Sequence, residues 1–250
     1  MGARAARPLL KLSKPTVITI QPDKLWQITL RFPPLIGVPT NCWLWNGGDG
    51  LTLIDCGCPN HGEEIVKISQ DIGAIKRVII THAHPDHAGA AAAISRALNV
   101  PVFAHEKETD FLSGKKTIHN ETGSLICRCV LWFAHNIGFN VPKVENLAQL
   151  KGEQEIEGLQ ILHTPGHTPG SISIFAPSIQ SLFCGDNLDN LHGKPALGQL
   201  WCTLDKDTRN SSLGQFDKLD ANRLLAGHGR PYESNTLPTE LKKLISTTSI

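Results

Sequence analysis

A cluster of side chains that bind metals stands at residues 81–87, where the chain reads Thr-His-Ala-His-Pro-Asp-His. It follows the apolar run Arg77–Ile80, whose composition predicts a short buried strand. Residues two apart in an extended chain point the same way, so His82 and His84 can face one metal ion together. Asp86 and His87 lie past the bend and can turn toward a second position. Imidazole nitrogens and carboxylate oxygens hold zinc, iron or manganese in sites that stay open to water.

Three later segments also end on potential ligands. Residues 163–170 form a proline- and glycine-rich turn, in which either His163 or His167 could bind a metal. Asp186 follows an apolar strand, and His228 stands between two glycines after another. A lone histidine at a strand end is usually a satisfied surface or core residue. Four apolar strands that each end on a potential ligand instead predict one site at a sheet edge.

These motifs together resemble the metallo-β-lactamase-fold superfamily. The HxHxDH cluster, the HTPGHTPGS turn, the strand ending in Gly-Asp, the late Gly-His-Gly and the earlier Leu53-Ile54-Asp55 occur in the family's order. The resemblance implies that His163 is a structural residue of its turn. It assigns the other side chains as follows: His82, His84 and His167 to a first metal ion, Asp86, His87 and His228 to a second, Asp186 as a bridge between them, and Asp55 as a carboxylate that orients the ligands from behind.

Strands with interleaved helices in both halves of the chain predict an α/β fold, with sheets covered by helices. The resemblance implies a four-layer αβ/βα sandwich of two mixed β-sheets, in one domain over residues 1–250. Residues from about 105 to 145 have helical character and predict an inserted helical cap. Its Trp132 and Phe133 could form an apolar wall over the metals or belong to a helical pair packed on the core. Tyr232, the only tyrosine, is a further candidate for contact with substrate.

The implied activity is that of a dinuclear metal-dependent hydrolase. Two divalent ions, zinc first and iron or manganese as alternatives, would share a water and lower its pKa, so that a bridging hydroxide attacks an acyl carbon. Asp86 is the candidate catalytic residue that carries the proton to the leaving group. The expected substrate is a small ester, lactone or thioester.

Alternatives stay open at this point. In true β-lactamases of the fold the position of Asp186 is usually cysteine or serine, which makes β-lactam hydrolysis a secondary interpretation. Phosphodiesterase or phosphotriesterase side activity is another, and an iron-dependent sulfur dioxygenase or a non-catalytic metal-binding protein are further ones. The stretch Asn187–Lys194 lacks the arginine-containing GCGR segment of glyoxalases, which argues against a glutathione thioester. Tyr232 does not match the position of the tyrosine that some lactonases use.

The amino-acid composition indicates which classes of partner to expect. The 250 residues carry a formal net charge of +1, which gives no broad attraction for nucleic acid or an anionic membrane surface. We therefore expect a small-molecule substrate, and a homodimer is one option for the assembly. The seven cysteines, including the pairs Cys56/Cys58 and Cys127/Cys129, are predicted to be thiols rather than a disulfide framework. The basic N-terminal segment has no apolar run typical of a secretory signal, so the expected location is the cytoplasm.

Overall fold

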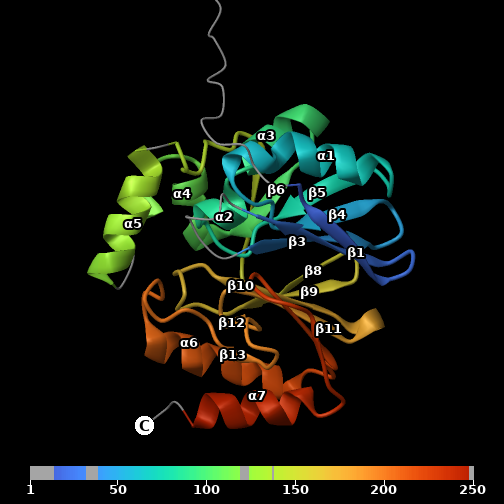
Figure 1. Ribbon diagram of the computed structural model, residues 1–250, viewed down its shortest axis with the longest axis vertical. Helices are drawn as coiled ribbons and strands as arrows, with labels where there is room; N and C mark the ends of the chain where they lie inside the picture. Colours follow the sequence, from blue (N-terminus) through green and yellow to red (C-terminus); the bar gives the residue numbers. More distant parts are fainter. Residues whose placement is uncertain (1–13, 32–38, 119–123, 137, 248–250) are drawn as a thin grey trace, which may run out of the picture.

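The computed structural model describes residues 14–31, 39–118, 124–136 and 138–247 (Figure 1). Its first half forms a seven-stranded sheet in the order β1-β2-β3-β4-β5-β6-β7. Neighbours from β1 to β4 are antiparallel, whereas β4 to β7 run parallel, so the sheet is mixed. The strand bounds are β1 Thr16–Gln21, β2 Leu25–Leu30, β3 Thr40–Asn46, β4 Leu51–Ile54, β5 Ile75–Ile79, β6 Val102–His105 and β7 Leu147–Leu150.

The second half forms a six-stranded sheet in the order β15-β14-β11-β10-β9-β8. It is also mixed, because β11 and β14 are parallel while the other neighbours are antiparallel. Its strands are β8 Gln154–Ile156, β9 Leu159–His163, β10 Ile172–Ala176, β11 Ser181–Gly185, β14 Arg223–Ala226 and β15 Tyr232–Glu233, and a separate pair joins β12 Leu188–Asp189 to β13 Ala196–Leu197.

The two sheets pack face to face, and helices cover their outer faces (Figure 1). Between the sheets lies an apolar layer that includes Trp43, Ile79, Ile174 and Phe183, all buried. The outer face of the first sheet packs on α1 Gly62–Gln70 and α3 Ala91–Leu98, and that of the second on α7 Leu237–Ser246 and on η5 Leu213–Lys218, which follows α6 Lys206–Ser212. The expected four-layer sandwich of two mixed sheets is therefore confirmed.

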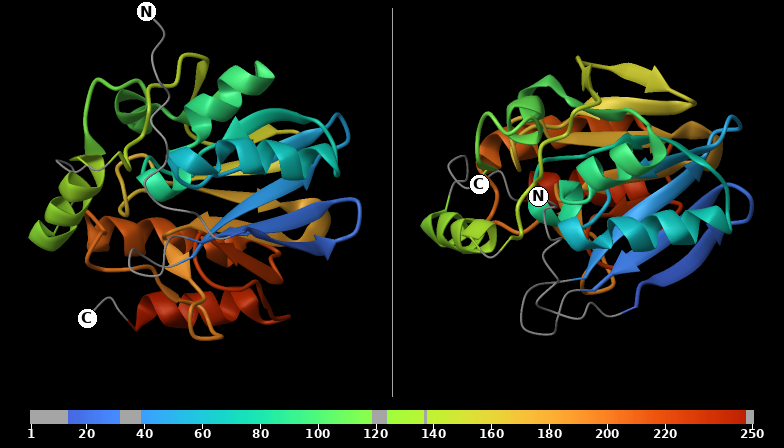
Figure 2. Two further views of the ribbon diagram at one scale, coloured as in Figure 1. Left: turned by 45° about the horizontal axis from the view of Figure 1, so that its top comes forward. Right: turned by 90° about the horizontal axis from the view of Figure 1, so that it is seen from above.

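Residues 105–145 contain the expected helical elements: η2 Glu106–Glu108, α4 Thr109–Leu112 and α5 Leu125–Asn136. Helix α5 lies at one side of the sandwich in all three views (Figures 1 and 2). Cys127 is the buried residue of its first turn, while Leu125, Ile126, Trp132 and Phe133 are each more than half exposed. One narrow face of α5 thus contacts the body of the protein, and most of its apolar side chains do not.

Several boundaries differ from the sequence-based prediction. The sequence predicts one strand over Gln154–His163, and this prediction is wrong: the chain reverses between β8 and β9, with Glu157 at φ 51° and Gly158 at φ 77°. Two successive left-handed residues make a tight hairpin turn, and Glu-Gly is a weak sequence signal for it. The prediction also lacked β7, β12, β13 and β15, which are short and take their stability from tertiary pairing. The sequence also predicts a strand over Leu25–Phe32 and a helix over roughly residues 124–137, and the last residue of each lies outside the described residues. The same is true of the basic N-terminal segment up to residue 13. In the part of the chain that is described, no helix combines the length and apolar character needed to cross a membrane.

Candidate metal centre

The first group of candidate ligands comes from both halves of the molecule. His82 and His84 follow β5, and His84 caps the short helix α2 Pro85–Ala88. His167 lies in the turn after β9. The Nδ1 atom of His84 is 3.0 Å from Nε2 of His82 and 3.0 Å from Nε2 of His167. All three side chains are buried, so three imidazoles converge on one small volume.

The second group is built the same way. Asp86 and His87 belong to α2, and His228 follows β14. Oδ2 of Asp86 is 3.6 Å from Nε2 of His87 and 3.5 Å from Nε2 of His228. His87 and His228 are buried, whereas the Asp86 side chain is 31% exposed. Asp86 is thus the member of the set with open access to solvent.

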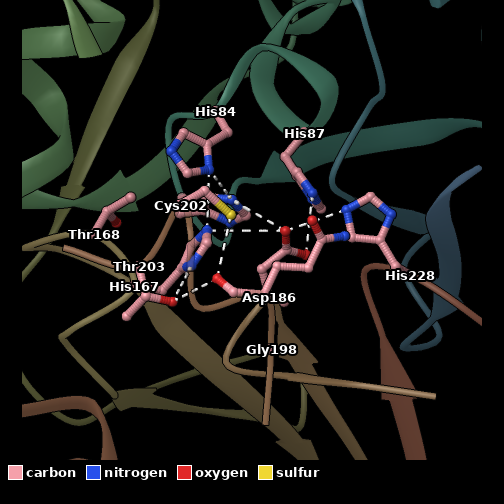
Figure 3. Close-up of polar contacts among 12 residues, drawn as sticks. His84, His87, His167, Thr168, Asp186, Gly198, Cys202, Thr203 and His228 are labelled. Atoms are coloured by element: carbon pink, nitrogen blue, oxygen red, sulfur yellow. Dashed lines mark hydrogen bonds and ion pairs between the residues drawn. The ribbon is translucent and has the colours of Figure 1, made fainter. Parts of the chain in front are cut away.

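Asp186 lies between the two groups (Figure 3). Its Oδ2 is 3.8 Å from Nε2 of His167 and 3.2 Å from Nε2 of His228, and its Oδ1 is 3.2 Å from Nε2 of His87. The ligand atoms of His82, His84, His167 and Asp186 all lie within 4.8 Å of one another, as do those of Asp86, His87 and His228. One carboxylate thus faces both clusters of ligand atoms.

The chemistry of this donor set fits two divalent cations. Nε2 of His87 and Oδ1 of Asp186 are buried, and although they lie 3.2 Å apart, neither atom has a well-aligned hydrogen bond among the described residues. Buried polar atoms are normally paired, and a cation satisfies both a nitrogen and a carboxylate lone pair. The close nitrogen pairs around His84 fit as well, because several imidazole lone pairs can share one cation. Nitrogen and carboxylate ligands accept zinc, with iron as an alternative.

Hydrogen bonds hold the second group from behind. Asp55 accepts hydrogen bonds from the backbone N–H and the hydroxyl of Thr81, both at 2.8 Å, and its Oδ2 is 2.9 Å from Nδ1 of His87. Nδ1 of His228 is 2.9 Å from the carbonyl oxygen of Pro39. In each case the partner of Nδ1 leaves Nε2 facing the cluster.

Gly227 allows the second-half strands to approach this closely. A Cβ atom at Gly227 would lie 2.3 Å from Oδ1 of Asp186 and 2.6 Å from Cε1 of His87. Any side chain there would therefore displace two candidate ligands.

The environment shifts the histidines in opposite directions. Burial lowers the pKa of His84 to about 4 and lowers the pKa values of His82 and His167 well below their usual range. Burial alone would also lower the pKa of His228, but the carboxylates of Asp186 and Asp86 outweigh it and raise that pKa to about 9. The pKa of His87 is raised for the same reason. The first group is therefore a set of neutral imidazoles, and the second is a set of ion pairs.

Other predicted residues lie apart from this cluster. His163 stacks on His105, with ring centroids 3.8 Å apart, and its Nε2 is 3.2 Å from the carbonyl oxygen of Pro169. The Tyr232 hydroxyl donates to Glu240 on α7 at 2.7 Å. Trp132 and Phe133 are on the exposed part of α5.

Sequence reasoning missed three residues around the cluster. Thr203 places its hydroxyl 3.4 Å from Nδ1 of His167 (Figure 3). The thiol of Cys202 lies 3.4 Å from the carbonyl oxygen of Gln199, to which the Thr203 hydroxyl also donates, and it interacts with the thiol of Cys127 on α5. Glu108 is fully buried and binds the ligand loops, although it lies in a charged segment, Glu106–Asp110, for which the sequence predicts only helical character. No local pattern distinguishes Glu108 from its exposed neighbours, because only tertiary packing buries it.

Comparison with known proteins agrees with this geometry. Residues 35–228 match the family described as the metallo-beta-lactamase superfamily. The chain is similar to the probable metallo-hydrolase YflN of Bacillus subtilis (strain 168), with 29% identity over 223 residues that span 80% of this chain and 83% of the relative. It is also similar to an N-acyl homoserine lactonase of a Bacillus species, with 26% identity over 61% of this chain and 64% of the lactonase.

Solved structures show the same fold. A crystal structure of TTHA1623 in a di-iron-bound form has 27% identity and a TM-score of 0.62, covering 81% of this chain and 94% of the other. A metallo-beta-lactamase from Erythrobacter litoralis has 19% identity and a TM-score of 0.69, covering 95% and 99%. At that identity the second likeness concerns the fold alone.

Proposed function

This chain belongs to the metallo-beta-lactamase superfamily and is a metallo-hydrolase, and we propose that it hydrolyses a small ester, lactone or thioester. The observation that carries the proposal is the position of Asp186, whose carboxylate faces both groups of ligand atoms. In this assignment His82, His84 and His167 would hold one ion, Asp86, His87 and His228 would hold the other, and Asp186 would contribute to both positions. When bound, the pair of ions supplies an activated water and stabilises negative charge on the substrate carbonyl.

The chain's own residues have separate tasks around this centre. Asp55 holds Nδ1 of His87, so that the opposite ring nitrogen is directed at the site. The three neutral imidazoles of the first group need no deprotonation before they bind a cation. The partly exposed Asp86 carboxylate reaches both the cluster and solvent, which supports its proposed role of delivering a proton to a leaving oxygen or sulfur.

Two features favour an ester or lactone over a β-lactam or a glutathione thioester. An aspartate at position 186 differs from the cysteine or serine usual at this place in true β-lactamases, as noted above. A relative named N-acyl homoserine lactonase is matched over 64% of its length, whereas a hydroxyacylglutathione hydrolase is matched over 41% of its length. Together with the missing arginine segment after Asp186, this supports a small lactone or simple ester rather than a glutathione thioester as the proposed substrate.

The test combines metal analysis with a substrate panel. We expect two metal ions per chain in fully loaded protein, and turnover of aliphatic lactones or nitrophenyl esters above that of a β-lactam or a phosphodiester. Elemental analysis with one firmly bound ion per chain would contradict the dinuclear assignment. If the β-lactam or the phosphodiester is turned over faster than the esters and lactones, that compound represents the substrate class instead.

A further inference from the structure

Glu108 is a buried carboxylate to which the proposed reaction gives no role. It ends the short helix η2, directly before α4, and its side chain has no exposed surface. Its Oε2 accepts a hydrogen bond from the backbone N–H of Ala83 at 2.8 Å. Its Oε1 accepts from the hydroxyl of Thr168 at 2.8 Å and from the backbone N–H of Gly170 at 2.7 Å. A buried charge is costly without such partners, and these three are short enough to be charge-assisted.

The three donors share one property: each lies in a loop that carries histidines of the first group. Ala83 stands between His82 and His84 in the connection that follows β5. Thr168 and Gly170 follow His167 in the turn that follows β9, in the other sheet. Glu108 therefore connects two loops that are more than 80 residues apart in sequence, at the point where their histidines come within 3.0 Å.

We propose that Glu108 is a positioning residue for the metal ion held by His82, His84 and His167: it fixes the two loops so that the three imidazoles converge before the ion binds. This proposal rests on the proposed function, because it concerns one position of the same metal centre. Before the ion binds, the contacts among the three imidazoles are the close ring-nitrogen pairs around His84, and the two loops need further attraction to hold them there. The hydrogen bonds to one carboxylate supply the attraction during folding, and so reduce what the ion must organise when it binds.

The second position is held by different contacts. His87 is held by Asp55, and His228 by the carbonyl oxygen of Pro39. Neither contact involves Glu108. Loss of the Glu108 carboxylate should therefore weaken one metal position and leave the other unchanged, which a general loss of stability would not do.

Glu108→Gln is the sharpest change available. The amide has nearly the same shape, but it replaces one accepting oxygen by an NH₂ donor. In one orientation this NH₂ faces the N–H of Ala83, and in the other it faces the N–H of Gly170. Either way, a donor meets a donor and one of the two loops is released. Glu106→Gln makes the same change two residues earlier on the exposed side of η2 and serves as the matched control.

The experiment measures zinc affinity in two backgrounds that each retain one metal position. His228→Ala keeps the first position, and His167→Ala keeps the second. Chelator competition should show Glu108→Gln weakening zinc about 10- to 100-fold in the His228→Ala background, the usual effect of losing a residue that supports metal ligands. It should cause no change in the His167→Ala background. The visible spectrum of the cobalt-loaded protein should change in the first background only, and Glu106→Gln should match its parent in both.

Circular dichroism and thermal unfolding of the metal-free proteins test whether each variant folds. If Glu108→Gln does not fold, Thr168→Val replaces it, because that variant removes one donor and retains the buried carboxylate. It should show a smaller weakening at the same position. Equal zinc affinity in the His228→Ala background, or equal weakening at both positions, overturns the positioning role while the dinuclear hydrolase stands. Failure of the wild-type protein to bind two ions overturns the proposed function itself, and is seen before any Glu108 variant is made.

Discussion

The two halves of the molecule contribute to the metal centre in opposite ways. The first half supplies His82, His84, Asp86 and His87 from six successive residues after one strand. The second half supplies His167, Asp186 and His228 from three connections that follow β9, β11 and β14. Local chain geometry arranges the first set, whereas sheet pairing arranges the second. Each proposed ion takes ligands from both halves, so the centre depends on the apolar layer that holds the sheets together.

The largest expected effect comes from the second-half carboxylate that faces both groups. Asp186→Ala should weaken the binding of at least one ion by more than about 100-fold, the upper end of what loss of a supporting residue costs. Turnover should fall with it. Elemental analysis after dialysis against a chelator checks the stoichiometry. Asp71→Ala, at an exposed aspartate after α1, controls for handling. Two ions retained in Asp186→Ala would show that the halves meet without this carboxylate.

The first-half carboxylate should behave differently. Asp86→Asn can keep some metal but loses the group that carries the proton, so turnover should fall about 10²- to 10⁴-fold for substrates with poor leaving groups. Nitrophenyl esters need little protonation and should suffer less. The measurement is the ratio of rates for good and poor leaving groups in the wild-type and Asp86→Asn proteins. An unchanged ratio in metal-replete protein would make Asp86 a ligand only.

The next prediction compares how zinc affinity depends on pH at the two metal positions, each of which includes one second-half histidine. Because the pKa of His228 is raised to about 9, its proton competes with a metal ion at every pH below that value. The pKa of His87 is raised too, so zinc affinity of the second position should rise with pH between 6 and 9, by up to about tenfold per unit for each of these protons that the ion displaces. The first position should stay level over this range, since the pKa values of His84 and His167 are lowered. Titrations of His167→Ala and His228→Ala measure the two positions separately, and parallel pH curves would remove the electrostatic distinction.

The smallest effect should come from α5, which belongs to the first half and contacts the second through Cys127 and Cys202. Trp132→Ala and Phe133→Ala remove exposed side chains, so the free energy of unfolding should change by no more than about 0.5 kcal/mol. If these rings contact substrate, the kcat/KM ratio between long-chain and short-chain esters should fall while metal content stays constant. A large loss of stability with equal activity on all esters would show that they pack on the core.

The sequence alone predicted a metal centre built from histidines and carboxylates. The candidate ligands are recognisable because they follow apolar strands, as Thr81–His87, Asp186 and His228 do. Strands that end at one edge of a sheet bring the residues after them together. The alternation of strands and helices likewise predicted the layers. These features are local, since a strand or a metal motif is written in adjacent residues.

Only the tertiary structure decided what supports that chemistry. His163 and His167 are equivalent ligands by residue type, and the structure stacks the first on His105 and directs the second at His84. The burial of Glu108 and the opposite pKa shifts of His167 and His228 depend on residues brought in from distant segments. Burial, hydrogen-bond partners and neighbouring charges are properties of the packed chain, and they are absent from any single stretch of its sequence.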